Sequence, residues 1–116
     1  MSIKDNENGW RLVISDMDGT LLDSQSRIYE NNLKAVRQLR AENIGFTLAT
    51  GRMDRMARAY VRELAIDQPI IACNGAVIRD CTTDQILWRQ NLPDDQALSL
   101  ISWLAGHGYD YLCYTP

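Results

Sequence analysis

Short apolar segments alternate with amphipathic ones over residues 11–73, and this alternation limits the possible folds more than any other feature. The expected strands are residues 11–15 (RLVIS), 46–50 (FTLAT) and 69–73 (PIIAC). Between them, residues 30–45 and 52–66 carry apolar side chains at helical spacing, and Gly45 is expected to end the first helix. The β-α-β-α-β order predicts an α/β fold, a Rossmann-like parallel sheet of three strands with two right-handed crossover helices covering its faces.

The pattern changes after residue 74. The segments expected there are an antiparallel hairpin (75–80 and 85–92), a helix (93–108) and a terminal strand (109–116, YDYLCYTP). We therefore predict a boundary near Ile78. Residues 1–78 would form a partial core domain, and residues 79–116 would begin an α/β cap that is incomplete.

Composition excludes several functional classes. The 116 residues are 46% hydrophobic, enough for one core, and the net charge of −3 provides no basic surface for nucleic acid. No apolar run approaches the roughly 20 residues of a membrane span, and the polar N-terminus lacks the apolar centre of a signal peptide. The three cysteines are odd in number and lack the spacing of a metal site, so we interpret them as reduced thiols of a cytoplasmic protein. Together with the charge and the lack of a long apolar run, this predicts no nucleic-acid or membrane partner.

Polar residues follow the end of each expected strand. Asp16 and Asp18 follow the first strand, Thr50 ends the second and is followed by Gly51, and Asn74 follows the third. Ligands of parallel α/β sheets bind beyond the carboxyl ends of the strands, so these side chains should share one crevice. Each also has a structural interpretation: Asp18 and Asn74 precede glycine, as turn residues often do, and Thr50 is a β-branched strand residue.

Two acids one residue apart favour chemistry over a plain turn. A carboxylate at a strand end can attack a phosphoryl group and carry it as an acyl phosphate. A second carboxylate can protonate the leaving oxygen and then activate water. These roles require opposite protonation states, which a divalent cation bound to the first carboxylate would favour. The Thr50 hydroxyl, together with Gly51, Asn74 and the N–H groups of these turns, would bind the phosphoryl oxygens.

The motifs resemble those of a known family. DMDGTLL (16–22) matches the DxDGT motif of the haloacid dehalogenase superfamily, TLATGR (47–52) matches its second motif, and CNGAVI (73–78) is similar to the Cof-type subfamily. The resemblance implies that Asp16 is the nucleophile and a Mg²⁺ ligand. It further implies that Asp18 is the general acid/base and offers its carbonyl to the metal, and that Thr50 binds the phosphoryl group.

The spacing of the motifs locates the cap. From position 16 to position 50 is 34 residues, and a βαβ crossover takes about 30, so a cap would have to follow the third strand. The family also uses a lysine and a further acidic metal ligand, carried beyond the cap. Neither Lys4 nor Lys34 is placed for that role. We therefore expect the 116 residues to be the first part of a longer enzyme, inactive or weakly active alone.

The leading interpretation is a Mg²⁺-dependent phosphatase acting on a small phosphorylated metabolite, a sugar phosphate or phosphorylated cofactor, through an aspartyl-phosphate. Two alternatives stay open: a phosphomutase of the same superfamily, and an inactive fragment that binds only metal or phosphate or self-associates. In the family's sheet the first strand is central. We therefore expect the LVIS strand to have an open apolar edge through which copies of the chain associate.

Overall fold

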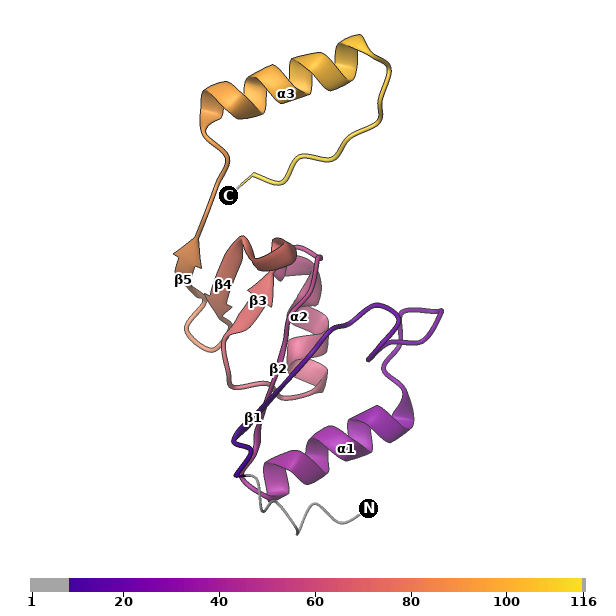
Figure 1. Ribbon diagram of the computed structural model, residues 1–116. Coiled ribbons are helices and arrows are strands. Elements are labelled where there is room, and N and C mark those ends of the chain that lie inside the picture. The colour runs from indigo at the N-terminus through magenta and orange to yellow at the C-terminus, as the bar shows by residue number, and fades with distance from the viewer. Residues whose placement is uncertain (1–8, 116) are drawn as a thin grey trace.

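The computed structural model describes residues 9–115 and contains the β-α-β-α-β order, the hairpin and the following helix that the sequence predicts (Figure 1). In chain order the elements are β1 (Leu12–Ser15), α1 (Glu30–Ala41), β2 (Gly45–Leu48), α2 (Asp54–Glu63), β3 (Ile70–Ala72), the short turn η2 (Cys73–Gly75), β4 (Val77–Asp80), β5 (Gln85–Arg89) and α3 (Asp94–Gly106). None of the helices within residues 9–115 is long and apolar enough to cross a membrane.

The parallel part of the sheet is formed by β1, β2 and β3. β1 pairs with β2 in parallel, from Leu12 opposite Gly45 to Ser15 opposite Leu48. A single parallel bridge between Ala49 and Ile71 then joins the end of β2 to β3. β4 and β5 continue from β3 as antiparallel strands. Because both crossovers run in the same direction along the sheet, α1 and α2 cover the same face of it (Figure 1).

The hydrophobic core lies between that face and the two helices. Its largest fully buried side chains are Met17, Leu22, Leu48 and Ile70. Val36 of α1 and Val61 of α2 close the cluster from the helical side. β2 is the most deeply buried strand, since it has a neighbour on each edge. This packing fixes the strand ends where the polar residues lie.

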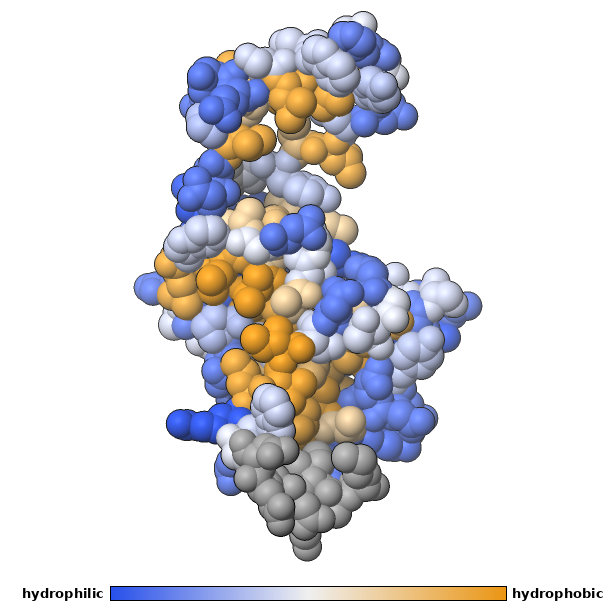
Figure 2. Space-filling model, in the orientation of Figure 1, coloured by the Kyte–Doolittle hydropathy of each residue, from blue (hydrophilic) through white to orange (hydrophobic). Residues whose placement is uncertain are grey.

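β1 is much less covered than its sequence predicts. A short run of branched apolar residues such as RLVIS is typical of a strand buried on both faces. Leu12 is 42% exposed and Ile14 is 51% exposed, so this strand does not follow that pattern. Among residues 9–115, β1 pairs with β2 alone, so its other edge has no strand partner in this part of the chain. Figure 2 shows hydrophobic surface over this part of the molecule.

The prediction that Gly45 ends the first helix needs correction. Gly45 does not end α1, which stops at Ala41, and Asn43 takes the left-handed conformation (φ 57°) instead. Gly45 begins β2, where an added Cβ would lie 3.1 Å from the Leu12 side chain. The glycine thus permits close contact between neighbouring strands.

The terminal strand expected at 109–116 is absent from the described part, residues 109–115. That segment turns back beneath α3, with the Tyr109 ring stacked on Trp103 and its N–H donating to the Leu104 carbonyl, and no strand lies alongside to pair with it. The proposed boundary near Ile78 falls inside β4, which pairs with β3. The division into residues 1–78 and 79–116 stays a prediction.

A buried ion pair joins α2 to the hairpin. Asp54, the first residue of α2, is 6% exposed, and its carboxylate pairs with the Arg79 guanidinium of β4. Arg79 also donates to the Asp84 carbonyl (2.7 Å) and carboxylate (3.0 Å) in the hairpin turn. Arg58, one turn along α2, pairs with the same Asp84 carboxylate.

Breaking the buried Asp54–Arg79 pair should lower the free energy of unfolding much more than breaking the exposed Arg58–Asp84 pair. Arg79→Met leaves the Asp54 carboxylate buried without a counter-charge, so we expect the free energy of unfolding to fall by about 3–5 kcal/mol. Arg58→Met breaks a largely exposed pair and should cost under about 1 kcal/mol. Urea unfolding followed by circular dichroism measures both. Equal losses would show that the Asp54–Arg79 pair carries no special weight.

The open edge of β1 predicts self-association. An unpaired apolar strand favours pairing with a second copy of the chain, so sedimentation at micromolar concentration should detect oligomers. Ile14→Lys places a charge on the exposed strand and should shift the distribution toward monomer, and the unfolding midpoint of this variant should no longer depend on protein concentration. A wild-type chain that stays monomeric throughout would contradict this expectation.

Candidate functional site

Asp16 and Asp18 lie on either side of the buried residue Met17. Met17 is fully buried, and its carbonyl accepts hydrogen bonds from the N–H groups of Leu21 (3.0 Å) and Leu22 (2.9 Å). Because side chains alternate along an extended chain, Asp16 and Asp18 both point away from the core, and both are exposed. Within residues 9–115 the Asp16 carboxylate makes no hydrogen bond or ion pair. It is therefore available to a ligand.

Main-chain hydrogen bonds bring the strand ends to one level. The Ala49 N–H donates to the Ser15 carbonyl (2.9 Å), which places the end of β2 beside Asp16. The Thr50 N–H donates to the Ile71 carbonyl (2.9 Å), which places the end of β3 beside the end of β2. The sequence-predicted residues thus follow three adjoining strand ends.

Thr50 and Gly51 form a tight loop against Asn74. The Asn74 N–H donates to the Thr50 carbonyl (3.1 Å), and Asn74 has a left-handed backbone (φ 53°). A Cβ added at Gly51 would lie 2.9 Å from the Asn74 Oδ1, so only glycine fits there without movement. Thr50 is 5% exposed, and its Oγ1 accepts the Arg52 N–H (3.1 Å). The hydroxyl proton is left free to be donated.

Arg52 is the charged residue that sequence reasoning left without a role. Its Nε lies 2.8 Å from Asp18 Oδ2, and its Nη2 lies 2.5 Å from Asp18 Oδ1, a bidentate ion pair across the loop. This pair lowers the pKa of Asp18, chiefly through the hydrogen bond, against a smaller effect of burial. The sequence feature that could have indicated a role for Arg52 is its position directly after Thr50 and Gly51, at the end of a strand.

The donor set suits a hard divalent cation. Mg²⁺ binds through one or two carboxylates and keeps several waters or phosphate oxygens. Asp16 offers an uncommitted carboxylate, whereas the Asp18 carboxylate is engaged by Arg52. Residues 9–115 contain no group of three or more histidine, cysteine or acidic side chains placed to hold a metal. The uncommitted Asp16 carboxylate could serve as one ligand of such a cation, but residues 9–115 alone do not complete a metal site.

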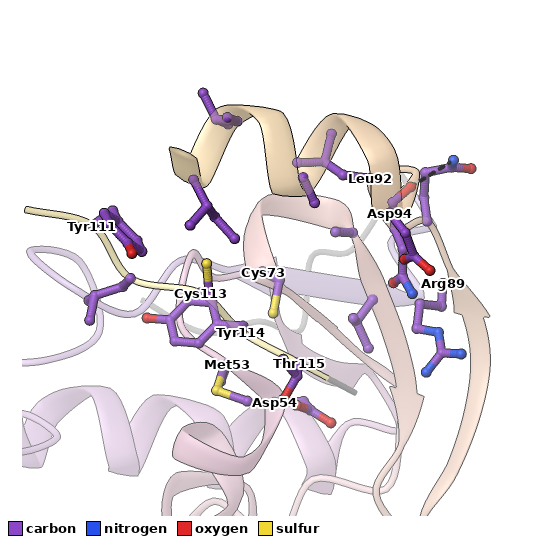
Figure 3. Close-up of a pocket in the computed structure, with 18 of the residues that line it drawn as sticks. Met53, Asp54, Cys73, Arg89, Leu92, Asp94, Tyr111, Cys113, Tyr114 and Thr115 are labelled. Carbon is purple, nitrogen blue, oxygen red and sulfur yellow. Dashed lines mark hydrogen bonds between the residues drawn. The ribbon is translucent and has the colours of Figure 1, made fainter. Parts of the chain in front are cut away.

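An open pocket of about 500 Å³ adjoins this loop and is bordered by the hairpin, α3 and residues 111–115 (Figure 3). Its walls are mostly apolar, from residues such as Val77, Leu100 and Tyr114. Met53 and Cys73, which border the Thr50–Asn74 loop, line one side of it. None of the five sequence-predicted site residues lines the pocket.

Comparisons with known proteins identify the family of the chain. The family model of the haloacid dehalogenase-like hydrolases matches residues 13–116. Phosphatase YwpJ of Bacillus subtilis is 30% identical over 105 residues, covering 90% of this chain and 36% of that protein. Pyridoxal phosphate phosphatase YbhA of Escherichia coli is 30% identical over 104 residues, covering 90% of this chain and 38% of that protein.

Solved structures show the same fold. A haloacid dehalogenase-like hydrolase from B. subtilis superposes with a TM-score of 0.74 at 30% identity, covering 84% of this chain and 34% of that one. The chain belongs to the haloacid dehalogenase-like hydrolase family. Its alignments with the two curated relatives span 36% and 38% of their lengths.

The Asp18–Arg52 pair gives a testable pH dependence. The folded-state pKa of Asp18 lies below its ordinary value of 3.8, so the pair stabilises the fold above pH 4. That contribution is lost as the pH falls through the lowered pKa. Carboxyl ¹³C NMR should show Asp18 titrating below its ordinary range, and Arg52→Gln should move the pKa back toward it. An identical Asp18 pKa in both proteins would contradict the ion pair.

Proposed function

We propose that the chain carries the nucleophile and phosphate-binding loop of a Mg²⁺-dependent phosphatase acting on small phosphorylated metabolites through an aspartyl-phosphate. The observation that carries this proposal is the convergence of Asp16 and Asp18 with the Thr50–Gly51–Asn74 loop at adjoining strand ends. Relatives named for phosphatase activity, including one named for pyridoxal phosphate, support the reaction class.

Asp16 attacks the phosphoryl group in this mechanism. Its carboxylate is exposed and uncommitted, and it lies at the end of the strand whose neighbour supplies Thr50. Attack forms an Asp16 Oδ–P bond while the P–O bond to the leaving group breaks. Asp18 must be released from Arg52 and protonated in the substrate complex, and it then gives that proton to the leaving oxygen. Asp18 then accepts a proton from the water that hydrolyses the acyl phosphate.

The loop supplies donors for the phosphoryl oxygens. The Thr50 hydroxyl proton is uncommitted, and the turn around Gly51 and Asn74 brings further N–H and amide groups to the same place. Magnesium, held by Asp16 and the Asp18 carbonyl, would neutralise charge on the transferred group. The adjoining apolar pocket would receive the leaving group, which favours substrates with some apolar or aromatic surface.

The supply of positive charge limits what the described residues can do alone. Lys34, the single lysine among residues 9–115, pairs with Glu30 on the surface of α1 (2.8 Å) and is not part of the crevice. Loss of one charge-stabilising group commonly costs about 10²–10³ in rate. We therefore expect slow turnover by the 116-residue chain compared with a protein of its relatives' length. A cytoplasmic location is part of the proposal, consistent with free Cys73, Cys81 and Cys113.

The nucleophile assignment is tested by Asp16→Asn in the enzyme. Removing the attacking carboxylate should lower kcat by about 10³-fold or more, because only binding and electrostatic effects remain. Phosphate release from pyridoxal phosphate and sugar phosphates, with and without Mg²⁺, measures this. Asp67→Asn, which removes an equal charge from an exposed position elsewhere, is the control. Near-normal turnover by Asp16→Asn, with deamidation excluded by mass spectrometry, would contradict the mechanism.

A further inference from the structure

The Arg52 side chain packs against Tyr60, which restricts its movement. It is 21% exposed, and its guanidinium carbon lies 5.5 Å from the centre of the Tyr60 ring. The Tyr60 hydroxyl lies 3.4 Å from Arg52 Nη1 and donates to the Ser26 carbonyl (2.8 Å). An arginine stacked on an aromatic ring and braced in this way loses little freedom when it binds an anion.

One edge of the guanidinium meets the two carboxylate oxygens of Asp18. The two contacts to Asp18, 2.8 and 2.5 Å, use Nε and Nη2, one edge of the fork. That edge fits two oxygens of a phosphate as well as it fits a carboxylate. The Arg52 N–H is bonded to the Thr50 hydroxyl oxygen, so its main chain belongs to the loop assigned to phosphate binding.

We propose that Arg52 is a further phosphoryl-binding residue and that Asp18 occupies its guanidinium only while no phosphate group is bound. The incoming phosphate monoester takes the Nε and Nη2 donors and frees the Asp18 carboxylate for its own role. This inference rests on the proposed function, since it assigns a ligand of the same site. Arg52 thereby couples substrate binding to the release of the acid/base residue.

The alternative is a permanent structural bridge. In that case Arg52 would tie the loop after β1 to α2 through Asp18, Ser26 and Tyr60, and its loss would lower stability without affecting anion binding. The two roles differ in one respect. Exchange makes Asp18 a competitor of phosphate, whereas a permanent bridge does not.

Phosphate titration of the full 116-residue chain distinguishes them, with inorganic phosphate as the probe. In ¹H–¹⁵N spectra the Arg52 Nε resonance should shift with bound phosphate, an observation that needs no variant. Arg52→Gln should weaken phosphate binding at least about tenfold, the range for a hydrogen bond between charged groups. Arg37→Gln removes an equal charge from an exposed position of α1 and should change the affinity less than about twofold.

A double-mutant cycle isolates the exchange. Asp18→Asn should strengthen phosphate binding because the competitor is gone, and this gain should disappear in the Arg52→Gln background. Asp16→Asn also removes a negative charge from the crevice, but its gain should persist without Arg52. Urea unfolding of each variant confirms that it is folded.

Several results would overturn the proposal. They are an unmoved Arg52 resonance, absence of phosphate binding to the wild-type chain up to tens of millimolar, or an Asp18→Asn gain that survives in Arg52→Gln. The proposed function fails separately, through undiminished turnover of Asp16→Asn. If the enzyme is an active phosphatase and Arg52→Gln binds phosphate as tightly as the wild-type chain, the role of Arg52 is rejected and the proposed function stands.

Discussion

The site depends on three main-chain hydrogen bonds at the ends of the parallel strands. Ala49 N–H to Ser15 carbonyl, Thr50 N–H to Ile71 carbonyl and Asn74 N–H to Thr50 carbonyl tie β1, β2 and β3 together where each strand stops. Residues far apart in the sequence thereby meet without relying on any one side chain. Buried Met17 and Leu48 hold this end of the sheet against the helices, so the exposed carboxylates project from a fixed frame.

Two ion pairs of different character then hold the loop between β2 and α2. The partly exposed Arg52–Asp18 pair joins this loop to the segment after β1, and the buried Asp54–Arg79 pair joins it to the hairpin. A buried pair is costly to break, whereas an accessible one can exchange partners. This difference suits a loop that must stay in place while one of its charged residues changes its ligand.

The sequence predicted the order of elements and the convergence of Asp16, Asp18, Thr50 and Asn74, because strand and helix periodicity fixes which residues end each strand. It did not predict the Arg52–Asp18 pair, since a salt bridge between residues 34 positions apart depends on side-chain placement that periodicity does not encode. The expected last strand was also wrong. An apolar, aromatic run indicates strand propensity, but a strand also needs a partner, and none lies beside residues 109–115.

The central claim is that Asp16 becomes phosphorylated during turnover, and chemical trapping tests it most directly. Rapid mixing of the enzyme with substrate and Mg²⁺, followed by borohydride, reduces an acyl phosphate to an alcohol, so an aspartate becomes homoserine. Peptide mass spectrometry should then find homoserine at position 16, dependent on substrate and reduced when hydrolysis is allowed to finish. Homoserine at another aspartate, or unmodified Asp16 during active turnover, would contradict the account.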